Sequence, residues 1–196
     1  MKRFFDLCVS LLVLVLLAPL FIVVIVVIRT TSLGPAFFRQ VRVGLNGKKF
    51  FLYKFRTMRT IMEAEQGRFD AGDTSRVTTV GRFLRKTKLD EFPQFFNVLK
   101  GDMSIVGPRP EIEKWVAVYP ERWRHVHTVR PGITDPASIA FRNEEDILSC
   151  SEDPERCYKE RILPKKLELY EEYVRNQSFG GDLKLIFKTA YTVFCK

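Results

Sequence analysis

The most conspicuous pattern along the chain is an apolar run near its N-terminus. Residues 7–28 contain no charged side chain, and leucine, valine and isoleucine dominate them. A helix of this length and composition matches a bilayer whose hydrocarbon layer is about 30 Å thick, so we expect the segment to lie in lipid. A cleaved signal peptide fits less well, because the run is long, lacks a small-x-small cleavage site and continues directly into basic sequence.

Positive charge on both sides of this run leaves its topology open. Lys2 and Arg3 precede it and Arg29 follows it, so the positive-inside rule draws both ends toward the cytoplasm. Pro19 removes one backbone donor and can break the helix, which would give a re-entrant segment. A straight span with a mild proline kink is the other interpretation. Under either one, we expect Asp6 to pair with Arg3 at the interface, because a carboxylate beside an apolar helix is costly without a partner.

A β-hairpin is predicted after the membrane segment. Short apolar and basic stretches alternate over residues 37–55, and the Asn46-Gly47 pair in LNGKKFFLYKF is a strong hairpin signal. Residues 60–75 are polar, acidic or interrupted by glycine, which indicates a mobile surface loop with a helical part around residues 61–66.

The second half of the chain has a mostly helical pattern. Helices are expected over residues 80–100, 111–119 and 165–175, with an irregular stretch over residues 131–143. Residues 183–194 place apolar side chains at helical spacing with Lys184 and Lys188 between them. That pattern predicts an amphipathic helix with a cationic side, suited to lying on a membrane surface, and packing against the core is the alternative.

Composition and charge narrow the class of partner. The chain has 196 residues, 46% of them hydrophobic, which suffices for one domain with a core plus the N-terminal appendage. Its formal net charge of +9 favours a negatively charged partner, such as nucleic acid, anionic lipid or a phosphorylated small molecule. The sequence contains no basic patch interleaved with aromatic residues, so nucleic acid is not expected.

The four cysteines do not indicate a metal site. Cys8, Cys150, Cys157 and Cys195 form no CxxC pair, and no histidine stands at ligand spacing from them. We expect reduced thiols in a cytosol-facing protein, and a disulfide between Cys150 and Cys157 stays open.

Candidate chemistry centres on two adjacent acids in a cationic region. Asp90 and Glu91 precede Pro93, and the apolar residues at 92, 95, 96 and 99 mark one face of a helix. Since proline is tolerated only in a first turn, we expect a helix to begin near residues 89–91 with Asp90 at its cap. A capping aspartate followed by a first-turn glutamate would explain both acids without any catalytic role.

The basic residues around the acids favour a catalytic site instead. Arg85 comes just before them, and Arg109 follows between Pro108 and Pro110, whose rings restrict the backbone and can hold the guanidinium ready for a phosphate. Nearby cations lower the pKa of a carboxyl group and keep it ionised, as a nucleophile or metal ligand requires. Further candidate phosphate contacts, of lower specificity, are Lys54, Arg56 and Arg130.

Three motifs stand out: KFRTM at residues 54–58, GRFLRKTKLDEFPQFFNVLKGDMSIVGPRPE at residues 81–111, and RPGIT at residues 130–134. They closely resemble the bacterial sugar transferase family, the monotopic phosphoglycosyl transferases, and the likeness to its minimal catalytic form covers nearly the whole chain. The resemblance implies an enzyme that moves a sugar 1-phosphate from a nucleoside diphosphate sugar, usually a UDP-sugar, to polyprenyl phosphate. UMP would be released, in the first step of surface glycan or glycoprotein assembly.

The resemblance also implies roles for individual residues. Asp90 corresponds to a nucleophile that forms a covalent phosphosugar intermediate in a ping-pong cycle, and Glu91 to its partner in metal placement or proton handling. Both acids are therefore expected to help hold Mg²⁺, while Arg85 and Arg109 neutralise phosphate charge. Many members of the family have glycine after the threonine of RPGIT; the aspartate at 135 departs from this and suggests a different sugar or nucleotide pocket.

For the N-terminal segment the resemblance implies the re-entrant form. The family signature is a basic pair, an acid and a helix-breaking proline, which here are Lys2, Arg3, Asp6 and Pro19. Ala18 stands where the family commonly has serine, so the hydroxyl that could bond a carbonyl freed by the proline is missing.

We therefore expect a mostly helical α/β monotopic membrane protein in two parts, a re-entrant anchoring helix over residues 1–30 and a cytosolic catalytic domain with amphipathic interfacial helices over residues 31–196. The resemblance implies the cytoplasmic face of a bacterial inner membrane, with Mg²⁺, a nucleoside diphosphate sugar, polyprenyl phosphate and membrane lipid as partners. The sequence leaves monomer and homodimer open. Two other functions compete: a membrane-anchored protein that binds anionic lipid or nucleic acid without catalysis, and an enzyme in which acceptor or water attacks directly with no covalent step.

Overall fold

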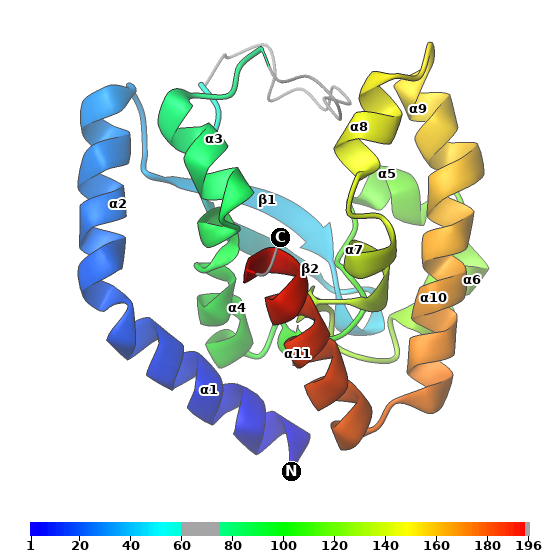
Figure 1. Cartoon of the computed structure of the whole chain (residues 1–196). Helices are drawn as coiled ribbons and strands as arrows, with labels where there is room; N and C mark the ends of the chain where they lie inside the picture. The colour runs from blue at the N-terminus through cyan, green and yellow to red at the C-terminus, as the bar shows by residue number, and fades with distance from the viewer. Residues whose placement is uncertain (60–74, 195–196) are drawn as a thin grey trace.

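Two small sheets lie among helices in the computed structural model, which describes residues 1–59 and 75–194 (Figure 1). The expected mostly helical α/β class is confirmed, and the loop predicted over residues 60–75 falls, apart from Ser75, outside the described residues. In chain order the elements are α1 (Lys2–Leu16), α2 (Ala18–Thr31), β1 (Phe37–Val43), the 3₁₀ turn η1 (Leu45–Gly47), β2 (Lys49–Phe55), α3 (Thr79–Lys86), the 3₁₀ turn η3 (Leu89–Glu91), α4 (Gln94–Lys100), β3 (Ser104–Val106), α5 (Glu113–Val116), α6 (Pro120–Val126), β4 (Gly132–Thr134), α7 (Pro136–Ala140), α8 (Glu144–Ser149), α9 (Pro154–Cys157), the π-helical turn η4 (Tyr158–Ile162), α10 (Leu163–Asn176) and α11 (Phe179–Phe194).

Helices α1 and α2 form one bent unit on the flank of the molecule. No single helix of the described residues is long and apolar enough to cross a membrane, but these two pass that test together, bent by 60°. Pro19 lies in the first turn of α2, where its missing N–H breaks no helical hydrogen bond, so the bend falls just before it, at Leu17. The large apolar residues of this unit that are 53–66% exposed are Leu11, Leu12, Val15, Leu16, Ile22, Val23 and Val26.

The beginning of the α1–α2 unit is hydrogen-bonded to strand β3. Asp6 is only 3% exposed, and its carboxylate accepts hydrogen bonds from Ser104 Oγ (2.8 Å) and Ile105 N (3.3 Å) on β3. Lys2 pairs with Asp182 on α11 and donates to the last carbonyl of β3 (3.0 Å). The start of the chain is therefore held by β3 and by the final helix at once.

The expected ion pair between Asp6 and Arg3 is wrong. Arg3 donates instead to the carbonyls of Val98 (2.7 Å) and Met103 (3.2 Å) around the end of α4. Carbonyls at the end of a helix lack intrahelical donors, so Arg3 donates to those at the end of α4. The Asp6 oxygens already accept hydrogen bonds from β3 and are not available to Arg3.

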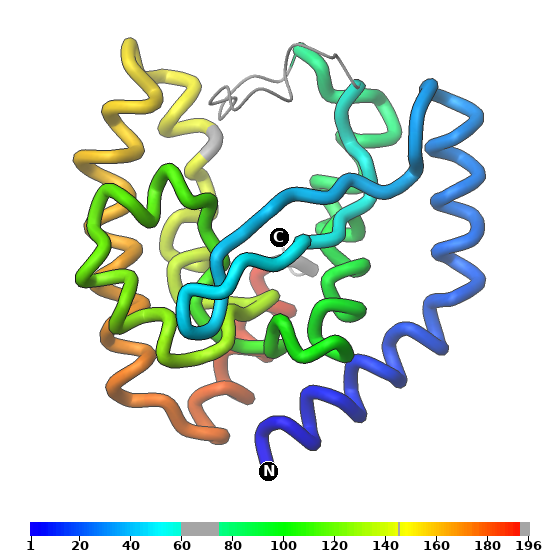
Figure 2. Tube along the Cα trace, turned by 180° about the vertical axis from the view of Figure 1, so that it is seen from behind, coloured from blue at the N-terminus to red at the C-terminus, as the bar shows by residue number. Residues whose placement is uncertain are grey.

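Strands β1 and β2 confirm the predicted hairpin. They are antiparallel, with Phe37 opposite Phe55 and Val43 opposite Lys49, and Figure 2 shows the hairpin running from the end of α2 toward α6. The turn places Asn46 at φ 54° and Gly47 at φ 73°, the left-handed region that these two residue types tolerate. The Asn-Gly signal therefore identified both the hairpin and its turn.

Residues 131–143 are not irregular, as the sequence pattern had predicted. They contain β4, which pairs in parallel with β3, and the short helix α7. The backbones at Gly132 and Gly107 lie too close together for a side chain, since a Cβ added at Gly132 would lie 2.1 Å from the Gly107 nitrogen. Elements of three and five residues are too short to show a period, and β4 exists through its pairing with a distant strand.

The helix predicted over residues 80–100 is broken into α3, η3 and α4. Lys88 has φ 57°, which ends α3, and Pro93 precedes Gln94, the first residue of α4. Asp90 is therefore not a helix cap: it lies inside η3 and makes no capping hydrogen bond. Proline can begin a helix but not continue one, and a left-handed residue cannot lie within one. Of the predicted apolar face, Phe92, Phe95 and Leu99 pack on the core, whereas Phe96 is exposed.

The C-terminal helices agree better with the sequence. The helix predicted over residues 165–175 lies within α10, and the amphipathic helix over residues 183–194 lies within α11, with Phe187 and Tyr191 exposed. The helix predicted over residues 111–119 shrinks to α5, because Pro120 begins a new helix.

Helices α1 and α2 share a core with the rest of the chain. Their buried residues pack together with Ala36, Phe55 and Leu84 from the hairpin region and α3. A second core surrounds Trp123 and Leu167 between α6 and α10. Cys8, Cys150 and Cys157 carry free thiols, so the disulfide left open by the sequence is not formed.

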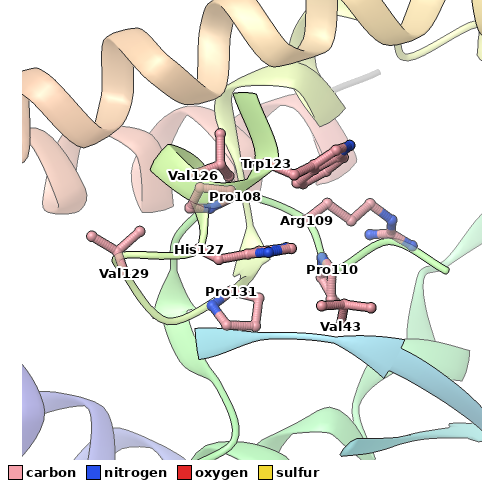
Figure 3. A pocket seen from close by; sticks show the side chains of 9 residues that line it. All are labelled: Val43, Pro108, Arg109, Pro110, Trp123, Val126, His127, Val129 and Pro131. Carbon is pink, nitrogen blue, oxygen red and sulfur yellow. The ribbon is translucent and has the colours of Figure 1, made fainter. Parts of the chain in front are cut away.

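A small pocket lies under the loop that carries Arg109 (Figure 3). Pro108, Arg109 and Pro110 line one side of it, and Trp123 and His127 of the α6 region line another. The His127 ring stacks on Trp123, with ring centroids 5.1 Å apart, and its Nε2 has no hydrogen-bond partner among the described residues. Burial lowers the pKa of His127 to about 4, so the loop rests on an uncharged ring at neutral pH.

Replacing Asp6 by alanine is expected to destabilise the protein. Two buried donors on β3 would lose their acceptor, which costs about 1–3 kcal/mol. For a chain of this size the Tm then falls by roughly 2–4 °C per kcal/mol. Thermal unfolding of the detergent-solubilised protein measures the change, with Glu121→Ala, an exposed member of a surface ion pair, as the control that leaves Tm unchanged. An Asp6→Ala protein as stable as the wild type would contradict this account of how α1 is held against β3.

Acidification is expected to destabilise the protein through His127. The folded-state pKa of about 4 lies below the ordinary value of 6.5, so the unfolded chain binds the proton first and stability falls as the pH drops through that window. At about 1.4 kcal/mol per pKa unit, the loss reaches at most roughly 3 kcal/mol. The Tm of His127→Gln should therefore fall less than that of the wild type between about pH 7 and about pH 4.5. His125→Gln, at the exposed histidine, should follow the wild type, and identical curves for all three proteins would refute the assignment.

Candidate active site

The two adjacent acids occupy the turn between α3 and α4 but have different surroundings. Asp90 and Glu91 are successive residues of the 3₁₀ turn η3, in which side chains diverge by about a third of a turn. The left-handed Lys88 follows α3 and Pro93 precedes α4, so the turn lies between two helices and directs its two carboxylates apart. The two side chains therefore meet different neighbours.

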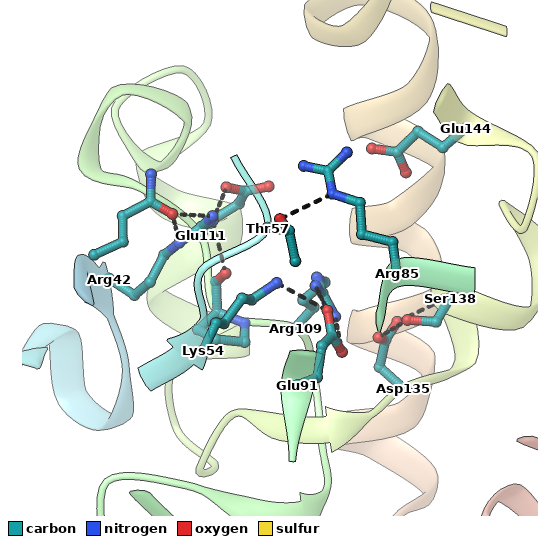
Figure 4. Close-up of polar contacts among 12 residues, drawn as sticks. Arg42, Lys54, Thr57, Arg85, Glu91, Arg109, Glu111, Asp135, Ser138 and Glu144 are labelled. Carbon is teal, nitrogen blue, oxygen red and sulfur yellow. Dashed lines mark hydrogen bonds and ion pairs between the residues drawn. The ribbon is translucent and has the colours of Figure 1, made fainter. Parts of the chain in front are cut away.

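Glu91 is the paired member of the two acids. Its Oε1 accepts from Lys54 Nζ (2.8 Å) and from Arg109 Nη2 (2.6 Å), and Arg109 Nη1 lies 3.4 Å from Oε2 (Figure 4). Burial alone would raise the pKa of Glu91, but Arg109 and Lys54 outweigh it and hold that pKa well below its usual value. Glu91 in turn raises the pKa of Arg109 well above its usual value. A strand, a turn and a loop are thereby joined at one carboxylate.

Asp90 is the unpaired member. It is only 7% exposed, and its Oδ1 has no hydrogen-bond partner among the described residues. Burial raises the pKa of Asp90; Lys54 opposes this effect and the charge of Glu91 adds to it. The sequence led us to expect that the surrounding cations lower the pKa of these carboxyl groups. That expectation is wrong for Asp90, the candidate nucleophile, and correct for Glu91. The physical reason is that Lys54 and Arg109 bond directly to Glu91, while Asp90 is desolvated without a bonded partner.

Arg85 of α3 lies on the same side as the acids. Its Nε donates to Thr57 Oγ1 (3.2 Å), which follows the β2 strand in the KFRTM segment, and its charge acts to lower the pKa of Asp90. Figure 4 shows the Arg85 guanidinium above the cluster of Lys54, Glu91 and Arg109. Three of the predicted phosphate-binding cations are thus brought together around the two acids.

The loop from Gly107 to Pro110 positions Arg109. Gly107 N donates to Thr134 O (3.0 Å) and Pro108 O accepts from Gly132 N (2.9 Å), so the first half of the loop is bonded to β4. The two prolines fix φ on either side of the arginine, as the sequence predicted. Their rings face the pocket of Figure 3, while the Arg109 guanidinium reaches Glu91.

Arg56 and Arg130 are not part of this cluster. Arg56 is buried, and its guanidinium donates to Ser32 O and Ser32 Oγ (2.8 Å each) and to Leu33 O, just past the end of α2. Arg130 donates to Gly101 O (3.0 Å) after α4, on the side of the anchor rather than the acids. Both arginines satisfy backbone carbonyls beyond helix ends, which a sequence does not reveal because the helices in question lie far away in the chain.

The structure adds residues to the site beyond the predicted acids and cations. Arg42 and Tyr158 both bond the carboxylate of Glu111, two residues beyond Arg109. Asp135 is fully buried, caps α7 by accepting from Ser138 N (2.8 Å), and contributes less than Glu91 does to the raised pKa of Arg109. The Asp-Pro-x-Ser pattern could have identified this cap, whereas nothing local distinguishes Arg42 from a surface arginine.

The donor set fits Mg²⁺ only in part. Among the described residues, no group of three or more His, Cys, Asp or Glu side chains could hold a metal ion. Mg²⁺ commonly binds through one or two carboxylates together with substrate phosphates, and the unpartnered Oδ1 of Asp90 suits that arrangement. Glu91 suits it poorly, because its oxygens already accept from Arg109 and Lys54.

Comparison with known proteins gives relatives across the whole chain. The family described as bacterial sugar transferase matches residues 1–196. The chain is 42% identical over 202 residues to a UDP-glucose:undecaprenyl-phosphate glucose-1-phosphate transferase of Klebsiella pneumoniae, a match that covers 98% of this chain and 40% of that protein. It is 39% identical over 193 residues to the uncharacterized sugar transferase EpsL of Bacillus subtilis (strain 168), covering 98% of this chain and 87% of that one.

A third relative has a different sugar in its name. The chain is 37% identical over 195 residues to a UDP-N-acetylgalactosamine-undecaprenyl-phosphate N-acetylgalactosaminephosphotransferase of Aeromonas hydrophila, covering 98% of this chain and 43% of that protein. The chain thus spans less than half the length of the Klebsiella and Aeromonas relatives and most of the Bacillus one. Since the family matches from the first residue to the last, the protein belongs to the bacterial sugar transferases.

Proposed function

We propose that the protein transfers a sugar 1-phosphate from a UDP-sugar to polyprenyl phosphate, with release of UMP, as an initiating step of glycan assembly. The observation that carries the proposal is the buried, unpartnered carboxylate oxygen of Asp90 in a site that also holds Lys54, Arg85 and Arg109. The names of the Klebsiella and Aeromonas relatives, which specify UDP-sugars and undecaprenyl phosphate, support the substrate classes.

The reaction proceeds in two displacements at one phosphorus. In the first, an ionised oxygen of Asp90 attacks the phosphorus that bears the sugar; a new P–O bond forms to the carboxylate, and the bond to the bridging oxygen breaks with its electron pair leaving on UMP. In the second, a phosphate oxygen of the polyprenyl phosphate attacks the same phosphorus, and the carboxylate of Asp90 leaves. The product is a polyprenyl diphosphate sugar, and Asp90 is regenerated.

The surrounding residues supply position and charge. Phosphoryl transfer depends on alignment and on neutralisation of the phosphoryl oxygens, for which Arg109, Lys54 and Arg85 are placed. Glu91 holds the first two of these cations in a fixed geometry, and its strongly depressed pKa makes it a poor proton acceptor. A raised pKa makes the ionised form of Asp90 more basic than an ordinary aspartate, which favours attack on phosphorus.

Mg²⁺ is part of the proposal as a partner of the donor. Asp90 and the diphosphate oxygens of the UDP-sugar would hold it, and the ion would neutralise negative charge on the diphosphate. Glu91 would join the ligands only by giving up a bond to Lys54 or Arg109.

We place the α1–α2 unit in the membrane as a re-entrant segment at the cytoplasmic face. Both of its ends are bonded to the same body of the protein, through Asp6 and Lys2 to β3 and through Arg56 to the residues after α2. A straight span would separate the two ends by the roughly 30 Å of a bilayer core. The 60° bend and the exposed apolar side chains of the unit support insertion from one face.

Asp90→Asn is expected to abolish turnover. The amide cannot serve as the attacking oxygen, so acceptor-dependent UMP release from UDP-sugars should fall by at least about a thousandfold, in line with the loss of a nucleophile. The assay uses detergent-solubilised protein, undecaprenyl phosphate, Mg²⁺ and a panel of UDP-sugars. Glu121→Gln, at an exposed carboxylate away from the site, is the matched control and should retain wild-type activity.

A trapping experiment distinguishes the covalent route from its competitors. Incubation with a UDP-sugar radiolabelled in the sugar, without acceptor, should leave label on wild-type protein and none on Asp90→Asn. Turnover without any trapped label would favour direct attack by the acceptor. Absence of turnover with every donor, combined with salt-sensitive lipid or nucleic-acid binding that does not depend on Asp90, would favour a binding protein.

The re-entrant topology predicts one-sided labelling. In a protein whose native cysteines are replaced by alanine, a cysteine in an N-terminal tag and a second at the exposed position Leu33→Cys should both react with a membrane-impermeant maleimide in inverted inner-membrane vesicles. Neither should react in right-side-out spheroplasts. Reaction of the two positions from opposite sides would establish a straight span.

A further inference from the structure

Arg42 lies on β1 and connects the hairpin to the loop of Arg109. Its Nη1 donates to Pro110 O (3.1 Å) and to Glu111 Oε2 (2.9 Å), the two residues that follow Arg109 (Figure 4). Its Nε and Nη2 both donate to Gln40 Oε1, at 3.1 and 2.7 Å. One arginine thus spans from its own strand to the loop, with its guanidinium oriented by a neighbouring amide.

Glu111 is the receiving group of this contact. Its side chain is largely buried, and besides Arg42 it accepts from the Tyr158 hydroxyl of η4 and from Ile112 N (2.9 Å). Its own backbone carbonyl accepts from Val43 N (2.9 Å), next to Arg42 on β1. The end of the Arg109 loop is therefore bonded to the hairpin through both backbone and side chain.

The two ends of the loop are held by different parts of the molecule. Gly107 and Pro108 are bonded to β4, whereas Pro110 and Glu111 are bonded to β1. Arg109 lies between these attachments, and its guanidinium reaches across to Glu91, beside Asp90. Any shift of the Pro110 attachment would move the Arg109 backbone relative to the acids.

We propose that Arg42 is a positioning residue for the phosphoryl transfer: by clamping Pro110 and Glu111 to the hairpin, it fixes the Arg109 guanidinium in the site. The inference rests on the proposed function, in which Arg109 stabilises charge on the transferred phosphoryl group. Arg42 itself contacts no reacting atom. It acts through Arg109, and the planar guanidinium suits this task because its nitrogens reach Gln40, Pro110 and Glu111 at once.

A double-mutant cycle between Arg42 and Arg109 tests the proposal. Arg42→Lys keeps the positive charge but loses the planar guanidinium that bonds Gln40, Pro110 and Glu111 together. The kcat for UMP release should then fall by about tenfold to a hundredfold, with KM within about threefold of wild type, as expected for misplacement of a catalytic group. In an Arg109→Lys background the same change should cost less than about threefold, since the group that Arg42 positions is already gone. Additive losses would overturn the proposal, as would an unchanged kcat in Arg42→Lys.

A nearby ion pair provides the matched control. Lys49 and Glu113 also join the hairpin to the residues after the loop, with a distance of 2.7 Å between Lys49 Nζ and Glu113 Oε2, but their side chains are 55% and 68% exposed. Lys49→Met should leave kcat and KM unchanged. An equal loss in this variant would show that any weakening of the hairpin lowers activity, and would overturn a specific role for Arg42.

Amide hydrogen exchange gives a readout that does not require turnover. In Arg42→Lys the amides of Val43 and Ile112, which both donate to Glu111, should exchange at least about tenfold faster, because the end of the loop opens more often. The amide of Gly107, which donates to Thr134 O on β4, should exchange as in the wild type. If Arg42→Lys misfolds, the double variant Arg42→Met/Glu111→Gln removes both charges together and should show the same local exchange with a Tm close to wild type. Unchanged exchange at Val43 and Ile112 would overturn the proposal. A wild type that releases no UMP from any donor would instead overturn the proposed function, and exchange would still report on the clamp.

Discussion

The shared carboxylate of Glu91 is the interaction on which the site depends. A buried carboxylate is expensive unless cations and hydrogen bonds surround it, and Glu91 obtains them from β2 through Lys54 and from the loop through Arg109. Strand β2, the loop of Arg109 and the η3 turn must therefore come together before the buried charge of Glu91 is stabilised. Once they do, the neighbouring Asp90 is left buried beside cations that are bonded to another group.

The break between α3 and α4 makes this arrangement available. A continuous helix over residues 80–100 would place two successive acids about 100° apart on one surface and leave their amides inside the helical ladder. The left-handed Lys88 and the proline at 93 interrupt the helix twice within six residues. Local strain of this kind is tolerated where the surroundings determine it, here through the core contacts of Leu89, Phe92 and Phe95.

Local sequence signals predicted local structure well. The Asn-Gly pair identified the hairpin, the apolar spacing identified α10 and α11, and the prolines around Arg109 indicated a restrained loop. The acid pair and three of its cations were also identifiable, because they all lie in two motifs, residues 54–58 and 81–111.

The remaining features depend on residues far apart in the chain. Arg56 bonds carbonyls near Ser32, Arg3 bonds carbonyls near residue 100, and Arg42 bonds a loop about seventy positions away, so none of these partners is visible in a window of helical or strand length. The raised pKa of Asp90 likewise follows from which neighbour the cations bond to, a question of geometry rather than of composition. Short elements such as β4 form only when their partner strand is in place.

The pairing of Lys2 with Asp182 has a consequence for biosynthesis. The two residues are 180 positions apart, so the N-terminal lysine leaves the ribosome long before its partner is made. During that interval the contact that unites α1, β3 and α11 cannot form. A chain arrested before α11 would therefore lack the contact that joins its first helix to its last, and its fold would stay open at that point.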